Sequence, residues 1–207
     1  MLFANEAAYD GIIAPAAAQY GVPAALVKAV IAHESRFVPT ASRSEPQLQD
    51  ASRGLMQLLF KTARDELGYT GQPDGLFAPG VNIPLGVRYL AKQLTRAGGD
   101  WAGAVSAYNG GYRPDLGFGR RATRVVTVCL ARDEKTGQCI RTRTVPIGEF
   151  ANQDYVNDVF KYWDHYKALE TAPVAPPPAS QPVVSSGGGC LGLLVLALVP
   201  VVVRVLA

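Results

Sequence analysis

The stretch that decides the fold is residues 23–36, Pro-Ala-Ala-Leu-Val-Lys-Ala-Val-Ile-Ala-His-Glu-Ser-Arg. At about 100° per residue, its large apolar side chains fall on one side of a helical wheel, with Glu34 near the middle of that side. These apolar residues are Leu26, Val27, Val30 and Ile31. The pattern predicts a helix whose apolar face is interrupted by one inward-pointing carboxylate.

A carboxylate among apolar neighbours loses hydration, which penalises its charged form and raises its pKa. Such a group suits a general acid that protonates a leaving oxygen near neutral pH. The alternative is that Glu34 merely ends the helix and extends to solvent, because charged residues are seldom buried without a partner.

Short blocks downstream of Glu34-Ser35 decide between these interpretations. In order, they are Gly54-Leu55-Met56-Gln57, Asn82-Ile83 with Tyr89-Leu90, Ala107-Tyr108-Asn109-Gly110-Gly111, and Tyr155-Val156. Each block alone is weak, but the ordered set resembles the soluble lytic transglycosylase and goose-type lysozyme family over roughly residues 10 to 168. The chain departs from that pattern at Leu59-Phe60, where Met/Pro is usual, and by an insertion between Gly111 and Tyr155.

The resemblance implies a mainly α, lysozyme-like α+β fold, with one helical catalytic domain at residues 1–170. Hydrophobic patterning and helix-end signals favour helices near residues 5–19, 23–36, 54–67, 84–97, 101–108 and 152–169. Residues 42–50 are predicted to form a polar loop.

The insertion, at about residues 118–147, is predicted to hold a basic β-hairpin. Two β-prone runs, 125–130 and 139–145, flank the turn-rich residues 133–137. Symmetrical closure places Cys129 opposite Cys139, which predicts a disulfide and an oxidising location. The alternative is two reduced thiols, whereas metal binding is not expected because the histidines are distant in sequence.

By the same resemblance, Glu34 would be the proton donor and Gln57 and Asn109 would hydrogen-bond the sugars beside the scissile bond. Met56 would form an apolar wall of the cleft. Ser35 would orient a polar group of the substrate. No cofactor is implied.

The two tyrosines of these blocks would also contribute, Tyr155 with a hydroxyl near the acid and Tyr108 as part of the cleft lining. Most of these roles have a structural alternative. The alternatives are core packing for Met56 and Tyr108, a surface amide for Gln57, a helix C-cap for Asn109 and a solvent-facing hydroxyl for Ser35. His33 points away from the apolar face and is expected to be structural.

Glycosidases generally use two carboxylates, but here one acid stands in a family block. Glu45 and Asp50 are the alternatives for a second carboxylate, and Asp100 suits a helix N-cap. A single acid points to assistance from the substrate's own N-acetyl group. Glu34 would then accept the proton of the sugar's 6-hydroxyl as a 1,6-anhydro ring closes.

The net charge of +3 is concentrated around the insertion and suits an anionic polymer such as peptidoglycan stems, or phospholipid headgroups. Nucleic acid is not expected, because aromatic residues are not interleaved with the basic ones. The arginines concerned are Arg120, Arg121, Arg124, Arg132, Arg141 and Arg143.

The composition changes after Glu170. Residues 171–189 are rich in Pro, Gly and Ser and are predicted to be a linker. Residues 190–207 are mostly apolar and are expected to insert into a membrane as a hydrophobic helix, although 190–203 is shorter than the roughly 20 residues that span a bilayer. The alternative is a tail that packs on a protein partner.

The N-terminal residues lack the features of a signal peptide. This leads to the expectation of a phage virion that delivers the enzyme to the host periplasm or inner membrane, in company with other virion or envelope-channel proteins. A membrane-anchored protein of the bacterial envelope is the alternative location. The leading hypothesis is thus a peptidoglycan lytic transglycosylase that opens the wall locally for genome delivery. The alternatives are a hydrolytic muramidase on the same fold and a non-catalytic, membrane-tethered virion protein.

Overall fold

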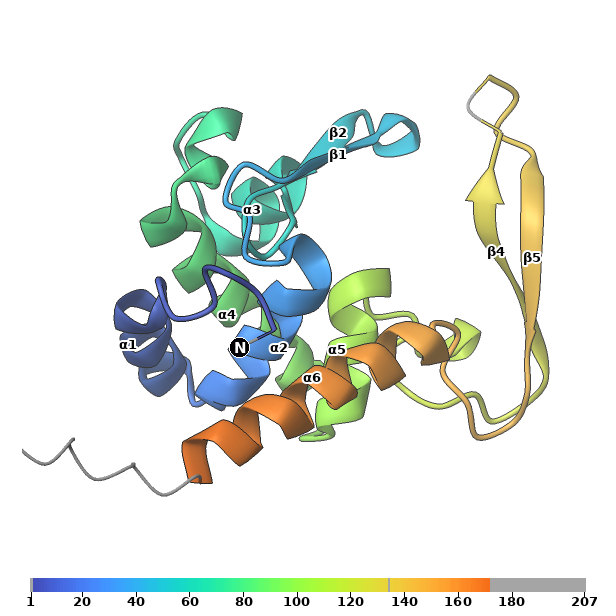
Figure 1. Ribbon diagram of the computed structural model, residues 1–207. Coiled ribbons are helices and arrows are strands. Elements are labelled where there is room, and N and C mark those ends of the chain that lie inside the picture. Colours follow the sequence, from blue (N-terminus) through green and yellow to red (C-terminus); the bar gives the residue numbers. More distant parts are fainter. Residues whose placement is uncertain (1, 134, 172–207) are drawn as a thin grey trace, which may run out of the picture. The chain divides into compact units, whose positions relative to one another are not determined.

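Helices dominate the part of the chain that the structure describes (Figure 1). The structure is a computed structural model, and it describes residues 2–133 and 135–171. The predicted mainly helical, lysozyme-like fold is confirmed. The helices are α1 (Asp10–Tyr20), α2 (Ala24–Ser35), α3 (Phe60–Leu67), α4 (Pro79–Arg96), α5 (Trp101–Gly110) and α6 (Gln153–Thr171), with 3₁₀ turns η1 (Pro46–Leu48), η2 (Pro73–Phe77) and η3 (Pro114–Leu116).

Helix α2 is the central element, and α1 and α6 pack against it. Its predicted apolar face is confirmed, because Leu26, Val27, Val30 and Ile31 are all 0% exposed. Full burial of each such side chain stabilises the fold by about 1.5–3 kcal/mol. The helix is therefore held firmly, and so is the acid in its last turn.

The end of α2 has an unusual backbone. Arg36 and Phe37 both have positive φ, at 52° and 61°, which is unfavourable for non-glycine residues by roughly 1–2 kcal/mol each. Phe37 is 0% exposed. The centroid of its ring lies 5.9 Å from that of the Phe3 ring and 6.3 Å from that of the Tyr166 ring. Burial of this ring offsets the strain and ends the helix directly after Glu34-Ser35.

A small antiparallel sheet follows α2, where the sequence predicted a loop at 42–50 and a helix from Gly54. Its strands are β1 (Ser42–Glu45), β2 (Asp50–Arg53) and β3 (Leu58–Leu59) in the order β1-β2-β3. Gly54 and Gln57 have φ of 77° and 47°, which no α-helix accommodates. The predicted helix therefore begins only at Phe60, and residues 54–57 form a turn.

The predicted hairpin is confirmed as β4 (Val126–Arg132) and β5 (Cys139–Val145). Its register differs from the symmetrical one, because Cys129 pairs with Thr142 and Cys139 with Arg132 across a bulge. A disulfide nevertheless joins Cys129 to Cys139, with 5.8 Å between their Cα atoms.

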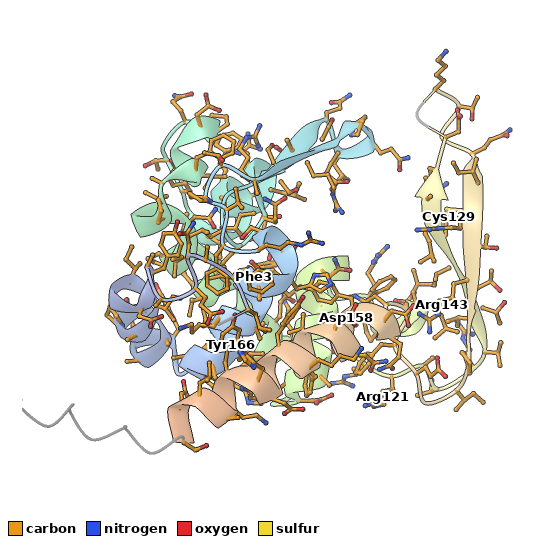
Figure 2. All side chains as sticks on the ribbon, viewed as in Figure 1. Phe3, Arg121, Cys129, Arg143, Asp158 and Tyr166 are labelled. Atoms are coloured by element: carbon orange, nitrogen blue, oxygen red, sulfur yellow. A yellow bond between two sulfur atoms is a disulfide. The ribbon has the colours of Figure 1, made fainter. Side chains whose placement is uncertain are left out.

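The root of the hairpin is attached to the helical body by apolar packing and an ion pair. Val128 and Val145 pack with Phe118 in a small apolar cluster of their own. Beside this cluster Arg143, labelled in Figure 2, binds Glu149 at 3.0 Å. The base of the hairpin is thus fixed, while its far end extends beyond this cluster.

The predicted membrane segment, residues 190–207, lies outside the described residues, as does the predicted linker apart from Thr171, which ends α6. Within the described residues, every helix is too short or too polar to cross a membrane. The division into domain, linker and tail stays a prediction.

Candidate active site

A cleft of ≈ 790 Å³ opens at the C-terminal end of α2, a volume in the usual range for ligand sites. Glu34 contributes its inner lining. The other lining residues come from β1, η1 and β2, from the 54–57 turn, β3 and α3, from α4, from the end of α5 with the segment after it, and from β4. Figure 1 shows where β1, α3, α5 and β4 lie in the fold.

The Glu34 carboxyl is half-buried in this cleft. Loss of hydration raises its pKa to about 7, and the hydrogen bond from Tyr155 and the positive charge of Arg43 oppose that rise only in part. Near neutral pH the group is therefore about evenly divided between its acid and base forms. It can donate a proton in one step and accept one in the next.

Tyr155 reaches Glu34 from α6. Its hydroxyl donates a 2.6 Å hydrogen bond to Glu34 Oε1, and its side chain is buried. Burial, together with the Glu34 charge, raises the pKa of Tyr155 well above 10, so the hydroxyl keeps its proton. The rings of His33 and Tyr155 meet edge to face, with 4.6 Å between their centroids, and this contact helps to orient the tyrosine, in keeping with the structural role expected for His33.

Tyr108 lines the cleft, as the sequence predicts, but its hydroxyl is used in a hydrogen bond within the protein. It donates a 2.8 Å hydrogen bond to the backbone carbonyl of Met56. Burial is the main cause that raises its pKa well above 10, with the charge of Glu34 adding to it. Tyr108 therefore offers its ring to the cleft while it anchors the turn at residues 54–57.

Met56 does not form the predicted apolar wall. Its side chain is 0% exposed and lies so close to Gly86 that a Cβ there would collide with it. The alternative of core packing describes its position. Because Met56 is the inner residue of the 54–57 turn, its burial instead fixes the residue that follows.

Gln57 lies on the cleft lining. Its Nε2 donates to the carbonyls of Ala41 and Gly54, both at 2.9 Å, and its Oε1 accepts from the Ser52 hydroxyl at 2.8 Å. Both amide protons are thus used within the protein. Only the free lone pair of Oε1 remains for a ligand, so the predicted contact with a sugar would have to use that oxygen as an acceptor.

Ser35 and Asn109 differ in their access to the cleft. Ser35 is buried and its hydroxyl donates to the carbonyl of Ile31 at 3.2 Å, so it is not directed at a substrate. Asn109 is exposed on the cleft wall inside α5, and its Oδ1 accepts from Asn152 Nδ2 at 3.0 Å. Among the described residues no acceptor meets the Asn109 amide nitrogen, which leaves it available to a ligand.

Two asparagines that hold the site together have no local signal that identifies this role. Asn82 is 0% exposed; it accepts from the Met56 N–H at 2.7 Å and donates to the carbonyls of Arg53 and Leu76. Asn152 accepts from the Ser106 hydroxyl at 2.7 Å and also binds Asn109. Both join segments that are far apart in sequence.

The alternative second carboxylates are both tied to the protein. Glu45 lies on the cleft lining, where Arg43 Nε donates to it at 2.7 Å. Burial alone would raise the pKa of Asp50. Hydrogen bonds from the Lys61 and Ala51 N–H groups and from Arg53 more than offset that effect, so the pKa of Asp50 is lowered. Asp50 therefore serves to join β2 to α3. Glu45 lies on the cleft lining with Glu34, as does Glu66, which is paired with Lys92 and Arg96.

Residues 2–133 and 135–171 contain no cluster of potential metal ligands. No three His, Cys, Asp or Glu side chains gather there as a metal site requires.

The sequence matches a known protein family. The family model of the transglycosylase SLT domain matches residues 11–122. The membrane-bound lytic murein transglycosylase C of Yersinia pestis is 36% identical over 117 residues, and that of Photorhabdus laumondii is 34% identical over the same length. The match covers 50% of this chain and 31% of each relative, so the chain spans about a third of their length.

Among solved structures, lytic transglycosylase Slt of Pseudomonas aeruginosa, determined as an inactive mutant, has a TM-score of 0.57 and 24% identity. The alignment covers 81% of this chain and 25% of that one. The 70 kDa soluble lytic transglycosylase of Escherichia coli has a TM-score of 0.56 and 20% identity, with coverage of 79% and 24%. At these identities the similarity shows the fold.

Proposed function

Because the chain belongs to the transglycosylase SLT domain family, we propose that it cleaves the β-1,4 bond between N-acetylmuramic acid and N-acetylglucosamine in peptidoglycan. The product would carry a 1,6-anhydro ring on the muramic acid. The observation that carries the proposal is the Glu34 carboxyl in the cleft, with a pKa of about 7 and the Tyr155 hydroxyl at 2.6 Å. The relatives' name, lytic murein transglycosylase, supports the substrate.

The reaction follows from the two protonation states of Glu34. Protonated Glu34 gives its proton to the glycosidic oxygen, the bond from that oxygen to the anomeric carbon breaks, and the substrate's N-acetyl oxygen bonds to that carbon. Glu34, now a carboxylate, takes the proton of the 6-hydroxyl, whose oxygen then displaces the N-acetyl oxygen. The ring closes, Glu34 is protonated again, and no water is consumed.

Tyr155 assists the middle of this cycle. Its hydroxyl donates to Glu34 Oε1 and remains protonated because its own pKa lies well above 10. A hydrogen bond to a carboxylate favours the charged form, so it stabilises Glu34 at the stage when its proton has left. Asn109 lies on the cleft wall, and its amide nitrogen would donate to the N-acetyl carbonyl of a bound sugar.

A hydrolytic muramidase on the same fold remains the closest alternative. Glu45 is the residue that favours it, because it is a second carboxylate on the cleft lining. A water molecule in place of the 6-hydroxyl would then yield a reducing end. A non-catalytic virion protein is the more distant alternative, and a cleft with a protonatable Glu34 argues against it.

The proposed place of action is the bacterial envelope. The relatives are membrane-bound by name, and the apolar residues 190–207 of this chain would provide a membrane attachment. Delivery of the enzyme by a phage particle, for passage of a genome and with other virion or channel proteins as partners, stays a prediction from the sequence.

The experiment compares Glu34→Gln with Glu45→Gln on purified peptidoglycan. Glu34→Gln keeps the side-chain volume but removes the proton donor, so release of soluble fragments should fall by at least about 10²-fold. Glu45→Gln, a matched change in the same cleft, should stay within about 3-fold of the parent if one acid performs both proton transfers. Activity of Glu34→Gln within a few-fold of the parent would refute the proposal.

A further inference from the structure

The hairpin insertion takes part in the cleft, although its root packs in a separate apolar cluster. Residues 130–132 of β4 are on the cleft lining, as are residues 46–48 of η1. Between them, Gln47 Nε2 donates a 2.9 Å hydrogen bond to the carbonyl of Arg132. The hairpin thus reaches the β1–β2 side of the cleft, 85 positions away in the chain.

These contacts complete a ring of elements around Glu34. Chain connectivity joins α2 to β1 and η1, the Tyr108–Met56 hydrogen bond joins the 54–57 turn to α5, and the segment after α5 leads into β4. The remaining join, between η1 and β4, is made by the bond between Gln47 and Arg132. Figure 1 shows the hairpin rising beside α5 toward the β1–β2 end of the molecule.

The disulfide stiffens the part of the hairpin that makes this join. Cys139 is bonded to Cys129 and is also the strand partner of Arg132. The covalent bond therefore encloses residues 129–132, the stretch with the bulge and the cleft-lining side chains. A bulge alone would leave this stretch loosely paired.

We infer that residues 130–132 and η1 form a bar across the cleft, so that a glycan strand enters by its end and is cut near that end. The inference rests on the proposed function and specifies how that site selects its substrate. On this inference, a short fragment reaches Glu34 without any opening of the bar. A long strand can be cut in its interior only when the bar is open.

The test compares long, uncross-linked glycan strands with a muropeptide tetrasaccharide. For the parent, short products should accumulate while the longest strands persist, measured as the length distribution at a fixed number of bonds cut. Gln47→Ala removes one exposed hydrogen bond, which changes an opening equilibrium by roughly 2- to 10-fold, so interior cuts should rise several-fold. The double variant Cys129→Ser with Cys139→Ser should make interior cuts still more frequent.

The matched control is Gln138→Ala, which removes the same side chain from an exposed position of the same hairpin. It should keep the parent's length distribution and, on the tetrasaccharide, a rate within about 2-fold of the parent's. Interior cutting by the parent from the start, or a Gln47→Ala distribution identical to the parent's, would overturn the inference while leaving the proposed function intact. If the parent cut neither substrate, the proposed function itself would fail.

Discussion

The hydroxyl of Tyr155 donates a 2.6 Å hydrogen bond to Oε1 of Glu34, although 121 positions separate the two residues in the chain. Packing of α6 against α2 brings them together. This hydrogen bond opposes the loss of hydration that raises the Glu34 pKa to about 7. The pKa of the acid is therefore a balance between its burial, which raises it, and the Tyr155 hydroxyl and the Arg43 charge, which lower it.

Tyr155→Phe should disturb that balance in a known direction. Without the hydroxyl the carboxylate loses a hydrogen bond, so the Glu34 pKa should rise further, by on the order of 1 unit. The alkaline limb of the kcat/KM profile against pH should move upward accordingly, and the rate at neutral pH should fall. Tyr162→Phe, on the same helix, should leave the profile unchanged. If the alkaline limb of the Tyr155→Phe profile stayed at the pH of the parent's, the Tyr155 hydroxyl would not lower the Glu34 pKa.

Glu34 should also make the protein less stable as the pH rises. Below about pH 4.5 it is protonated in both the folded and the unfolded chain, whereas between pH 4.5 and about 7 only the unfolded chain ionises. The free energy of unfolding therefore falls with pH across this window, by up to about 3 kcal/mol, and is constant above it.

Glu34→Gln cannot ionise, so it should be more stable than the parent at pH 8 and similar to it at pH 4. Urea unfolding at the two pH values measures the difference. An equal or smaller free energy of unfolding for the variant at pH 8 would mean that the folded site does not penalise the charge.

Asn82→Ala should destabilise the fold by about 3 kcal/mol or more, because it leaves the buried Met56 N–H and two carbonyls without their partner. The 54–57 turn should loosen at the same time and reduce activity. Asn157→Ala, at an exposed position of α6, should change the free energy of unfolding by less than about 0.5 kcal/mol. Equal effects of the two substitutions in urea unfolding would show that Asn82 does not support the site.

The helical spacing of apolar residues predicted much of the helical framework. In α2 these residues recur on one face, and that face is the one that is buried. Glu34 was identifiable for the same reason, as the charged residue within that face. The ordered blocks then placed Tyr155 and Tyr108 at the acid, a placement that no local pattern contains.

The region from Ser42 to Leu59 was not predictable in the same way. Its strands are short and β1 is mostly exposed, so no alternation of apolar and polar residues marks them. The turn depends on Gly54, where a side chain would strike the Leu76 carbonyl and Asn82, and on the left-handed Gln57. Both requirements arise from tertiary contacts.

Polar contacts between residues that are far apart in sequence were not predicted either. The bond between Gln47 and Arg132 depends on how far the hairpin extends, and the bulge in β4 shifts the cysteines out of direct opposition. Asn82 and Asn152 act through backbone and amide groups on other elements. A single sequence contains no signal for such pairings.

The most direct measurement of the central claim is mass spectrometry of the fragments that the purified protein releases from peptidoglycan at neutral pH. If Glu34 first donates a proton and then accepts that of the 6-hydroxyl, the new muramic acid ends should be 1,6-anhydro ends, and Glu34→Gln should release almost none of them. Reducing ends, which arise by addition of water, would contradict the account and indicate a muramidase.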